Sequence, residues 1–82
     1  MPVTDALIQN AIASSVVGLT RHVMGKYGKS DADAYRMVYD SELFKLLSNA
    51  RTRLFLMTNK ELGVFLDAEV AQGVSALHDL LA

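Results

Sequence analysis

The chain has 82 residues, carries a formal net charge of −1 and contains no cysteine. One small domain over residues 1–82 is expected, with a thin core, because so short a chain buries only about 60% of its unfolded surface. Without cysteine, neither disulfides nor thiolate metal sites can supplement that core. The near-neutral charge excludes a strong overall attraction to nucleic acid. Hydrophobic residues make up 51% of the chain, which favours a buried self-interface.

Residues 3–27 are predicted to form one long helix with two apolar stripes at helical spacing. Together the stripes cover more than half of the circumference, so the helix should be buried on more than one side. Either the other helices or a second copy of the chain could cover the second side. The candidate interface therefore comprises a first stripe of Ile8, Ile12, Val16, Leu19 and Val23, or a second stripe of Ala13, Val17 and Met24.

Short helices are expected in the middle of the chain. Ser30 or Asp31 should cap a helix over residues 31–39, and Ser41 should open another through Ser48. Asn49 should cap a further turn over residues 50–57. The apolar run at 54–57 has the length of a strand, but no second strand is available to pair with it.

The clearest local signal is the capping box Thr58-Asn59-Lys60-Glu61, in which threonine and glutamate satisfy each other's backbone amides. It predicts a final helix from there to about Leu81. At 1.5 Å per residue, the first and last helices would each be about 36 Å long. They would lie alongside one another or alongside those of a second copy. The predicted fold is all-α, a small helical bundle of two long terminal helices and two or three short central helices.

Few residues suggest catalysis. The two histidines, His22 and His78, are not part of a recognisable catalytic motif. His78 precedes Asp79, but adjacent helical residues point about 100° apart and do not form a dyad. His22 is expected to be a half-exposed structural residue. The sequence therefore predicts a protein that is not an enzyme and has no cofactor and no metal.

Charge is unevenly distributed. Residues 21–53 carry seven Lys or Arg against four Asp or Glu, whereas residues 54–82 carry one against four. This polarity is compatible with head-to-tail or antiparallel self-association, although scattered solvated charge would look the same. Arg51 and Arg53 are the candidate partner-binding residues, and the alternative is that they are solvated and paired with Asp40 or Glu42.

Residues 31–48 could also form a helix-turn-helix, with Ser41–Ser48 as the reading helix. Basic residues would then contact phosphates. That helix is mostly apolar and carries one basic residue, Lys45, so its side chains should belong to the core. Nucleic-acid binding is therefore the weaker alternative.

Part of the chain resembles a family of short all-helical bacterial proteins of unknown function, over residues 33–69. The family has an aromatic residue and a serine before a short leucine-rich helix. Arg53 stands where the family has a lysine, and Thr58 where it has a serine. The matching positions are Ala34, Tyr39, Ser41, Leu46-Leu47, Arg51-Thr52-Arg53-Leu54, Thr58 and Glu69. The resemblance implies a bacterial protein without catalytic residues, and some members look like companions of toxin-like proteins, which implies binding or neutralisation.

We therefore expect a non-enzymatic protein-interaction module that forms a homodimer through its long helices and that could also bind another protein. A cytoplasmic location is expected, because no targeting signal or membrane span is visible in the sequence. The alternative is a small DNA-binding regulator or antitoxin-like protein that uses the basic middle segment.

Overall fold

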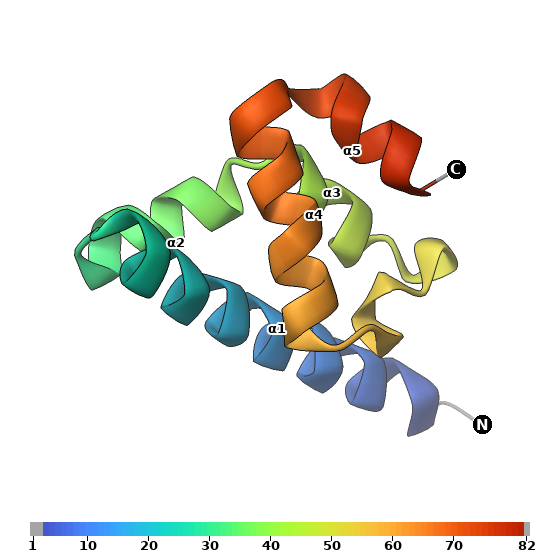
Figure 1. Cartoon of the computed structure of the whole chain (residues 1–82). Helices are drawn as coiled ribbons and strands as arrows, with labels where there is room; N and C mark the ends of the chain where they lie inside the picture. The colour runs from blue at the N-terminus through green and yellow to red at the C-terminus, as the bar shows by residue number, and fades with distance from the viewer. Residues whose placement is uncertain (1–2, 82) are drawn as a thin grey trace.

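The computed structural model describes residues 3–81, and this part of the chain is built from helices without a strand (Figure 1). The predicted all-α bundle is confirmed, as is the rejection of a strand at residues 54–57. Two short 3-10 turns, η1 and η2, connect α3 to α4. The elements are α1 Val3–Tyr27, α2 Asp31–Tyr39, α3 Glu42–Ser48, η1 Ala50–Thr52, η2 Leu54–Leu56, α4 Asn59–Gln72 and α5 Val74–Leu81.

Helix α1 forms the base on which the other elements pack (Figure 1). Helix α2 folds back beside the C-terminal part of α1, α4 crosses α1, and α5 turns away from the far end of α4. The core lies between these helices. Its buried apolar residues are Ile12, Val16, Leu19, Val23, Ala34, Val38, Leu43, Leu47, Leu54, Leu62, Leu66 and Leu77.

Three predicted helix starts are confirmed by their caps. The hydroxyl of Ser30 accepts a hydrogen bond from the Asp33 amide at 3.2 Å, and that of Ser41 accepts one from the Phe44 amide at 3.1 Å. The Thr58 hydroxyl accepts a bond from the Glu61 amide at 3.1 Å, and the Glu61 carboxylate accepts one from the Thr58 amide. Such caps need only residues within one turn, so they can be predicted from the sequence.

The prediction of one continuous helix from residue 59 to about 81 is wrong. Gly73 interrupts it with φ 91° and ψ −179°, a conformation that is open almost only to glycine. Helix α4 has 14 residues and α5 has eight, so among the helices of residues 3–81 only α1, with 25 residues, is long. Helix α4 also crosses α1 instead of lying beside it along its length (Figure 1).

The first apolar stripe of α1 is also corrected as an interface. Leu19 and Val23 have no exposed surface, and Ile12 and Val16 are buried with them in the core of the same chain. Ile8 is half-buried and packs against that core. These residues are covered by the chain's own helices, so a second copy cannot reach most of this stripe.

Candidate protein-interaction surface

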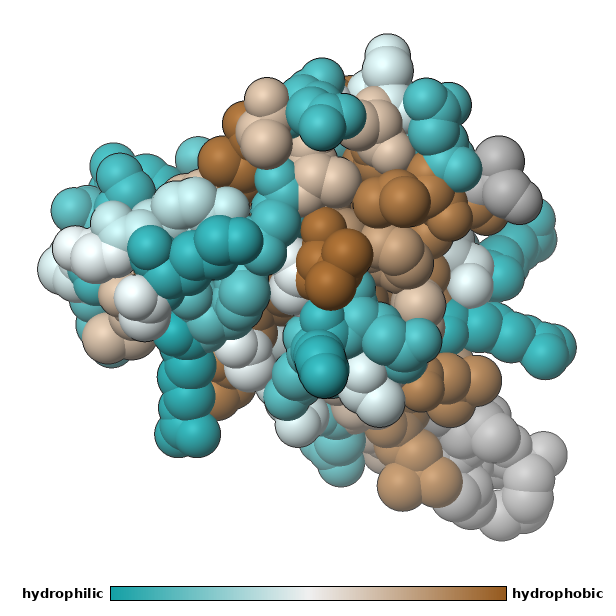
Figure 2. Space-filling model, viewed as in Figure 1, coloured by the Kyte–Doolittle hydropathy of each residue, from teal (hydrophilic) through white to brown (hydrophobic). Residues whose placement is uncertain are grey.

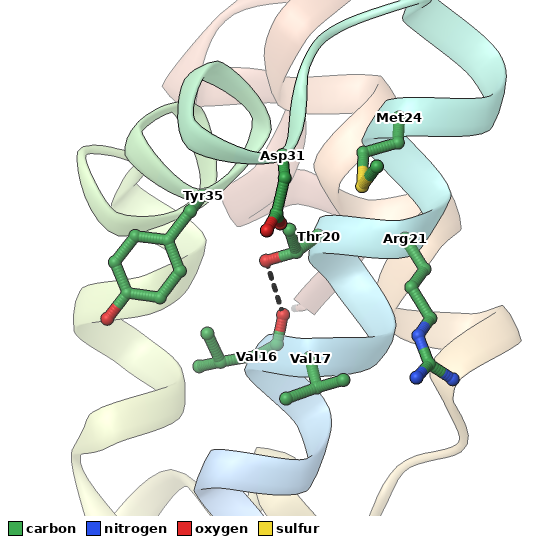
Figure 3. A pocket seen from close by; sticks show the side chains of 7 residues that line it. All are labelled: Val16, Val17, Thr20, Arg21, Met24, Asp31 and Tyr35. Carbon is green, nitrogen blue, oxygen red and sulfur yellow. Dashed lines mark hydrogen bonds between the residues drawn. The ribbon is translucent and has the colours of Figure 1, made fainter.

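The second stripe of α1 faces a groove between α1 and α2. One hollow of about 450 Å³ lies there, and Figure 3 shows its lining. A second hollow of about 300 Å³ shares Val16, Val17 and Tyr35 with the first and extends toward Phe44 on α3. We call the two together the α1–α2 groove. It is lined by Gln9, Ile12, Ala13, Val16, Val17, Thr20, Arg21, Met24, Asp31, Tyr35, Tyr39 and Phe44.

One wall of this groove consists of stacked aromatic rings. Tyr35 and Tyr39 are one helical turn apart on α2, with ring centroids separated by 5.7 Å. Tyr39 stacks in turn on Phe44 at 4.5 Å. Both tyrosines are about half exposed. Tyrosine presents a large apolar face with a polar tip, which is why it is enriched at protein interfaces.

The opposite wall is the outer side of α1, where Val17 is 50% exposed and Met24 is 36% exposed. Thr20 lies between them, but its hydroxyl donates to the carbonyl of Val16 at 2.8 Å and so adds no unsatisfied polar group to the floor (Figure 3). The second stripe of the predicted interface therefore lies on the surface of the described chain, whereas the first lies inside it.

Two opposite charges border the groove. Arg21 extends from α1 and Asp31 stands at the start of α2, and the two side chains point in different directions (Figure 3). Among the described residues, neither takes part in an ion pair. The groove thus presents one available cation and one available anion around an apolar floor.

A separate polar cluster fastens α1 to α4 through Asp67. Its carboxylate accepts hydrogen bonds from His22 Nε2 at 2.9 Å, Lys26 Nζ at 2.8 Å and the Tyr27 hydroxyl at 2.7 Å. Burial disfavours the charged carboxylate, but the bonds from Lys26, Tyr27 and His22 outweigh it and lower the pKa of Asp67 from 3.8 to about 2. Burial and the neighbouring carboxylate of Asp67 raise the pKa of Tyr27 to about 12.

This cluster has the geometry of a structural clamp. A Cβ at Gly63 would lie 3.2 Å from the His22 ring, so glycine there allows the imidazole to pack closely on α4. The anion already has several hydrogen-bond donors, and within residues 3–81 no second carboxylate shares them. The arrangement stabilises a charge instead of poising it for proton transfer, which requires a pKa near the working pH.

The start of α3 is occupied by another carboxylate from α4. Glu69 accepts hydrogen bonds from the amides of Glu42 at 2.8 Å and Leu43 at 2.9 Å. A negative charge at a helix N-terminus is favourable, but it repels a nucleic-acid phosphate from the same position. Leu43 and Leu47 on this helix are buried in the core. The geometry therefore gives no support to α3 as a DNA-reading helix.

Arg51 and Arg53 lie apart from the α1–α2 groove. Both are exposed, as the solvated alternative expects, and within residues 3–81 neither pairs with Asp40 or Glu42. Glu42 instead forms an ion pair with Lys45, with 3.7 Å between Glu42 Oε1 and Lys45 Nζ. Arg53 has a left-handed backbone, with φ 57° and ψ 20°, and borders a different apolar hollow of about 400 Å³.

The helices of residues 3–81 include none with the length and apolar character needed to cross a membrane. Nor does this part of the chain gather three His, Asp or Glu side chains in an arrangement that could hold a metal ion.

Comparison with protein-family models, with curated proteins and with solved structures found no match. The resemblance over residues 33–69 accordingly stays a prediction.

The aromatic wall and the two carboxylate contacts were not predicted from the sequence. Tyr35 and Tyr39 have a signal that could have revealed them, since residues four apart on a helix share a face. Asp67 and Glu69 have no comparable signal, because the partners of Asp67 lie 40 to 45 positions away in the sequence and those of Glu69 lie 26 or 27 away.

Proposed function

We propose that the chain is a non-enzymatic protein-interaction module that pairs with a second copy through the α1–α2 groove. The supporting observation is the exposure of Val17 and Met24 beside Tyr35 and Tyr39, along the one long helix. A contiguous apolar surface with a polar border is typical of a protein-binding site. Tyrosine and methionine are also among the residue types enriched at the centres of interfaces.

A second copy is the proposed occupant because the groove carries complementary charges on its two sides. In a two-fold dimer the same surface is used by both copies, so any contact between one residue and a different residue of the other copy occurs twice. Arg21 of each copy would then meet Asp31 of the other copy. The small side chain of Ala13, which is exposed in the same groove, allows two α1 helices to approach closely.

The broader charge polarity of the chain supports the dimer less than this local pair. Of the acidic residues after position 53, Glu61, Asp67 and Glu69 all accept hydrogen bonds within the chain. Their charges are committed to a capping box, to the α1–α4 clamp and to the start of α3. Charge complementarity is therefore proposed for Arg21 and Asp31 alone.

Sedimentation equilibrium at micromolar concentration tests the proposal. The wild type should sediment with twice the 9.0 kDa mass of one chain. Val17→Asp should raise the dissociation constant on the order of a hundredfold, since it places a carboxylate in the apolar floor of the interface. One helical turn from Arg21, this carboxylate would also compete with Asp31 of the other copy for that cation. The matched control is Val64→Asp, on α4 outside the groove, where the side chain is similarly exposed at 55%. A monomeric wild type, or equal effects of the two substitutions, would contradict the proposal.

Charge exchange tests the orientation of the two copies. Arg21→Asp alone should weaken the dimer, because two acidic side chains would then face each other. Arg21→Asp combined with Asp31→Arg should restore most of the affinity, since the cation and the anion have only changed places. Asp31→Arg is measured alone as well. If the double variant raises the dissociation constant by the product of the two single fold-changes, the two residues are not neighbours across the interface.

Bacterial origin and a cytoplasmic location form part of the proposal. They are supported by the resemblance of residues 33–69 and by the absence of cysteine from the sequence. The DNA-binding alternative has no comparable observation in its favour, because the core covers one side of α3 and Glu69 covers its N-terminus.

A further inference from the structure

We propose that Gly73 is a hinge through which two copies of the chain exchange α5. In the exchanged form, α4 and α5 of each copy join into one helix, and α5 packs on the other copy. This interaction uses neither Val17 nor the rest of the α1–α2 groove, so it does not depend on the function proposed above.

The backbone around Gly73 is helical on both sides up to this one residue. The amide of Gly73 donates to the carbonyl of Glu69 at 2.8 Å, as it would inside a helix, and the carbonyl of Gly73 accepts from Ala76 at 3.2 Å. Only the dihedral angles of Gly73, φ 91° and ψ −179°, separate α4 from α5. Rotation at this residue is therefore enough to convert the bent form into a straight helix over residues 59–81.

The amino-acid pattern favours that straight helix. Apolar residues continue at spacings of three and four across the break, so they would lie on one side of an uninterrupted helix. Glycine is also disfavoured inside a helix by about 1 kcal/mol relative to alanine, which helps to keep the bend. The residues of this stripe are Leu62, Leu66, Val70, Val74, Leu77 and Leu81.

The packing site of α5 can accept the same helix from another copy. Leu77 has no exposed surface and belongs to the core cluster that includes Leu43 and Leu62, and Leu81 packs against this cluster. An α5 from a second copy would present identical side chains to an identical site. Exchange of an identical element restores the packing that opening of the hinge disrupts, which makes it a low-cost route to a dimer.

The exchanged dimer would also bury surface that the single chain leaves open. Val70 and Val74 flank the hinge and are each 45% exposed. Figure 2 shows apolar residues gathered at this end of the molecule, over α4 and α5. In the exchanged form the two straight helices meet at their hinges, so the four valines of the two copies can pack together. This added burial favours the dimer over two separate chains.

Gly73→Ala in a chain that also carries Val17→Asp tests the exchange, because the second change removes dimers formed through the groove. Alanine is strained at φ 91° and is favoured in a helix, so both effects promote the straight form. Two hinges change in each dimer, and the dimer association constant should rise on the order of a hundredfold. The matched control is Gly25→Ala, inside α1, where φ is not positive and an added Cβ meets nothing within 4 Å.

Gel filtration after refolding at high concentration should show a dimer for Gly73→Ala that persists for hours after dilution, because separation requires α5 to detach. A monomer for both glycine variants, or a dimer that dissociates at once on dilution, overturns the exchange. If Gly73→Ala does not fold, the Val17→Asp chain with its native Gly73 tests the exchange. That chain should yield a minor, slowly dissociating dimer after refolding at millimolar concentration, and its complete absence overturns the proposal.

Discussion

Asp67 on α4 accepts a hydrogen bond from the hydroxyl of Tyr27 at the end of α1, with 2.7 Å between the oxygens. The same carboxylate accepts bonds from His22 and Lys26, which precede Tyr27 on α1. One acidic side chain therefore fixes the C-terminal part of the long helix to α4. The α1–α2 groove extends along α1 from Gln9 to Met24, so its C-terminal end lies on the turns of α1 that this clamp fixes.

The stability of the fold should decrease in acid because of Asp67. Its pKa is about 2 in the folded chain and 3.8 as a free side chain. A carboxyl group whose pKa is lowered by folding contributes its full stabilisation at pH values above its pKa in the unfolded chain. This contribution is lost as the pH falls from about 4 to about 2. We expect the free energy of unfolding in urea to fall by about 1–2 kcal/mol across this interval.

Asp67→Asn isolates this contribution. The variant should be less stable than the wild type at pH 7 and should lose the part of the acid dependence that comes from residue 67. Asp79→Asn is the matched control, since Asp79 is an exposed acidic residue on α5 that forms no ion pair within residues 3–81. If both variants retain the acid dependence of the wild type, Asp67 is not its source.

Glu69→Ala should destabilise the fold by about 1–2 kcal/mol, because it leaves the amides of Glu42 and Leu43 without an acceptor. Glu69→Gln should cost less, since its amide oxygen can still accept one bond although the favourable charge at the helix N-terminus is lost. Urea titration monitored by circular dichroism measures both. Stability should decrease in the order wild type, Glu69→Gln, Glu69→Ala. If Glu69→Ala is as stable as the wild type, water replaces the carboxylate as the acceptor for the two amides.

The difference between Ser41 and Glu69 explains how much of the fold could be predicted. Ser41 caps α3 from a position three residues before Phe44, so the chain order itself reveals it. Glu69 caps the same helix from α4, and nothing near it in the sequence indicates its partner. The helix starts could therefore be predicted, whereas the contacts that join α1, α3 and α4 required the structure.

The candidate site was predicted in part for the same reason. Periodicity placed Val17 on a second apolar stripe, but it could not decide which stripe the chain itself covers. That choice depends on where α2 and α4 pack, and the first stripe with Leu19 proved to be the internal one. Gly73 could not be recognised as a break either, because a glycine inside a regular apolar pattern is also compatible with a continuous helix.

Gly18→Ala should separate the effect of close packing from that of helix propensity. A Cβ at Gly18 would overlap the side-chain amide of Asn59, whereas one at Gly25 meets nothing within 4 Å. Alanine at an open helical position adds up to about 1 kcal/mol of stability. Gly25→Ala should therefore be stabilising, and Gly18→Ala should gain less stability than Gly25→Ala, because the exposed Asn59 amide must turn away from the new methyl group.

The Asn59→Ala background provides the control for this pair of variants. Removing the amide leaves room for the new methyl group, so the two glycine substitutions should become similar in their effects. Thermal and urea unfolding of the four combinations measure the coupling between residues 18 and 59. A difference that persists without the amide would place the cost of Gly18→Ala elsewhere than in the contact between α1 and α4.

Arg53→Gly should stabilise the fold although it removes a candidate partner-binding side chain. Arg53 has φ 57°, in the left-handed region, where a non-glycine residue costs about 1–2 kcal/mol. Glycine relieves this strain but is more flexible in the unfolded chain, so a net gain of about 0.5–1 kcal/mol is expected. Arg51→Gly is the comparison, because Arg51 lies in the 3-10 turn η1 without a positive φ and should lose stability with glycine. If Arg53→Gly destabilises the chain instead, the arginine side chain must contribute more through its contact with the apolar hollow at Leu7 and Phe55 than its backbone conformation costs.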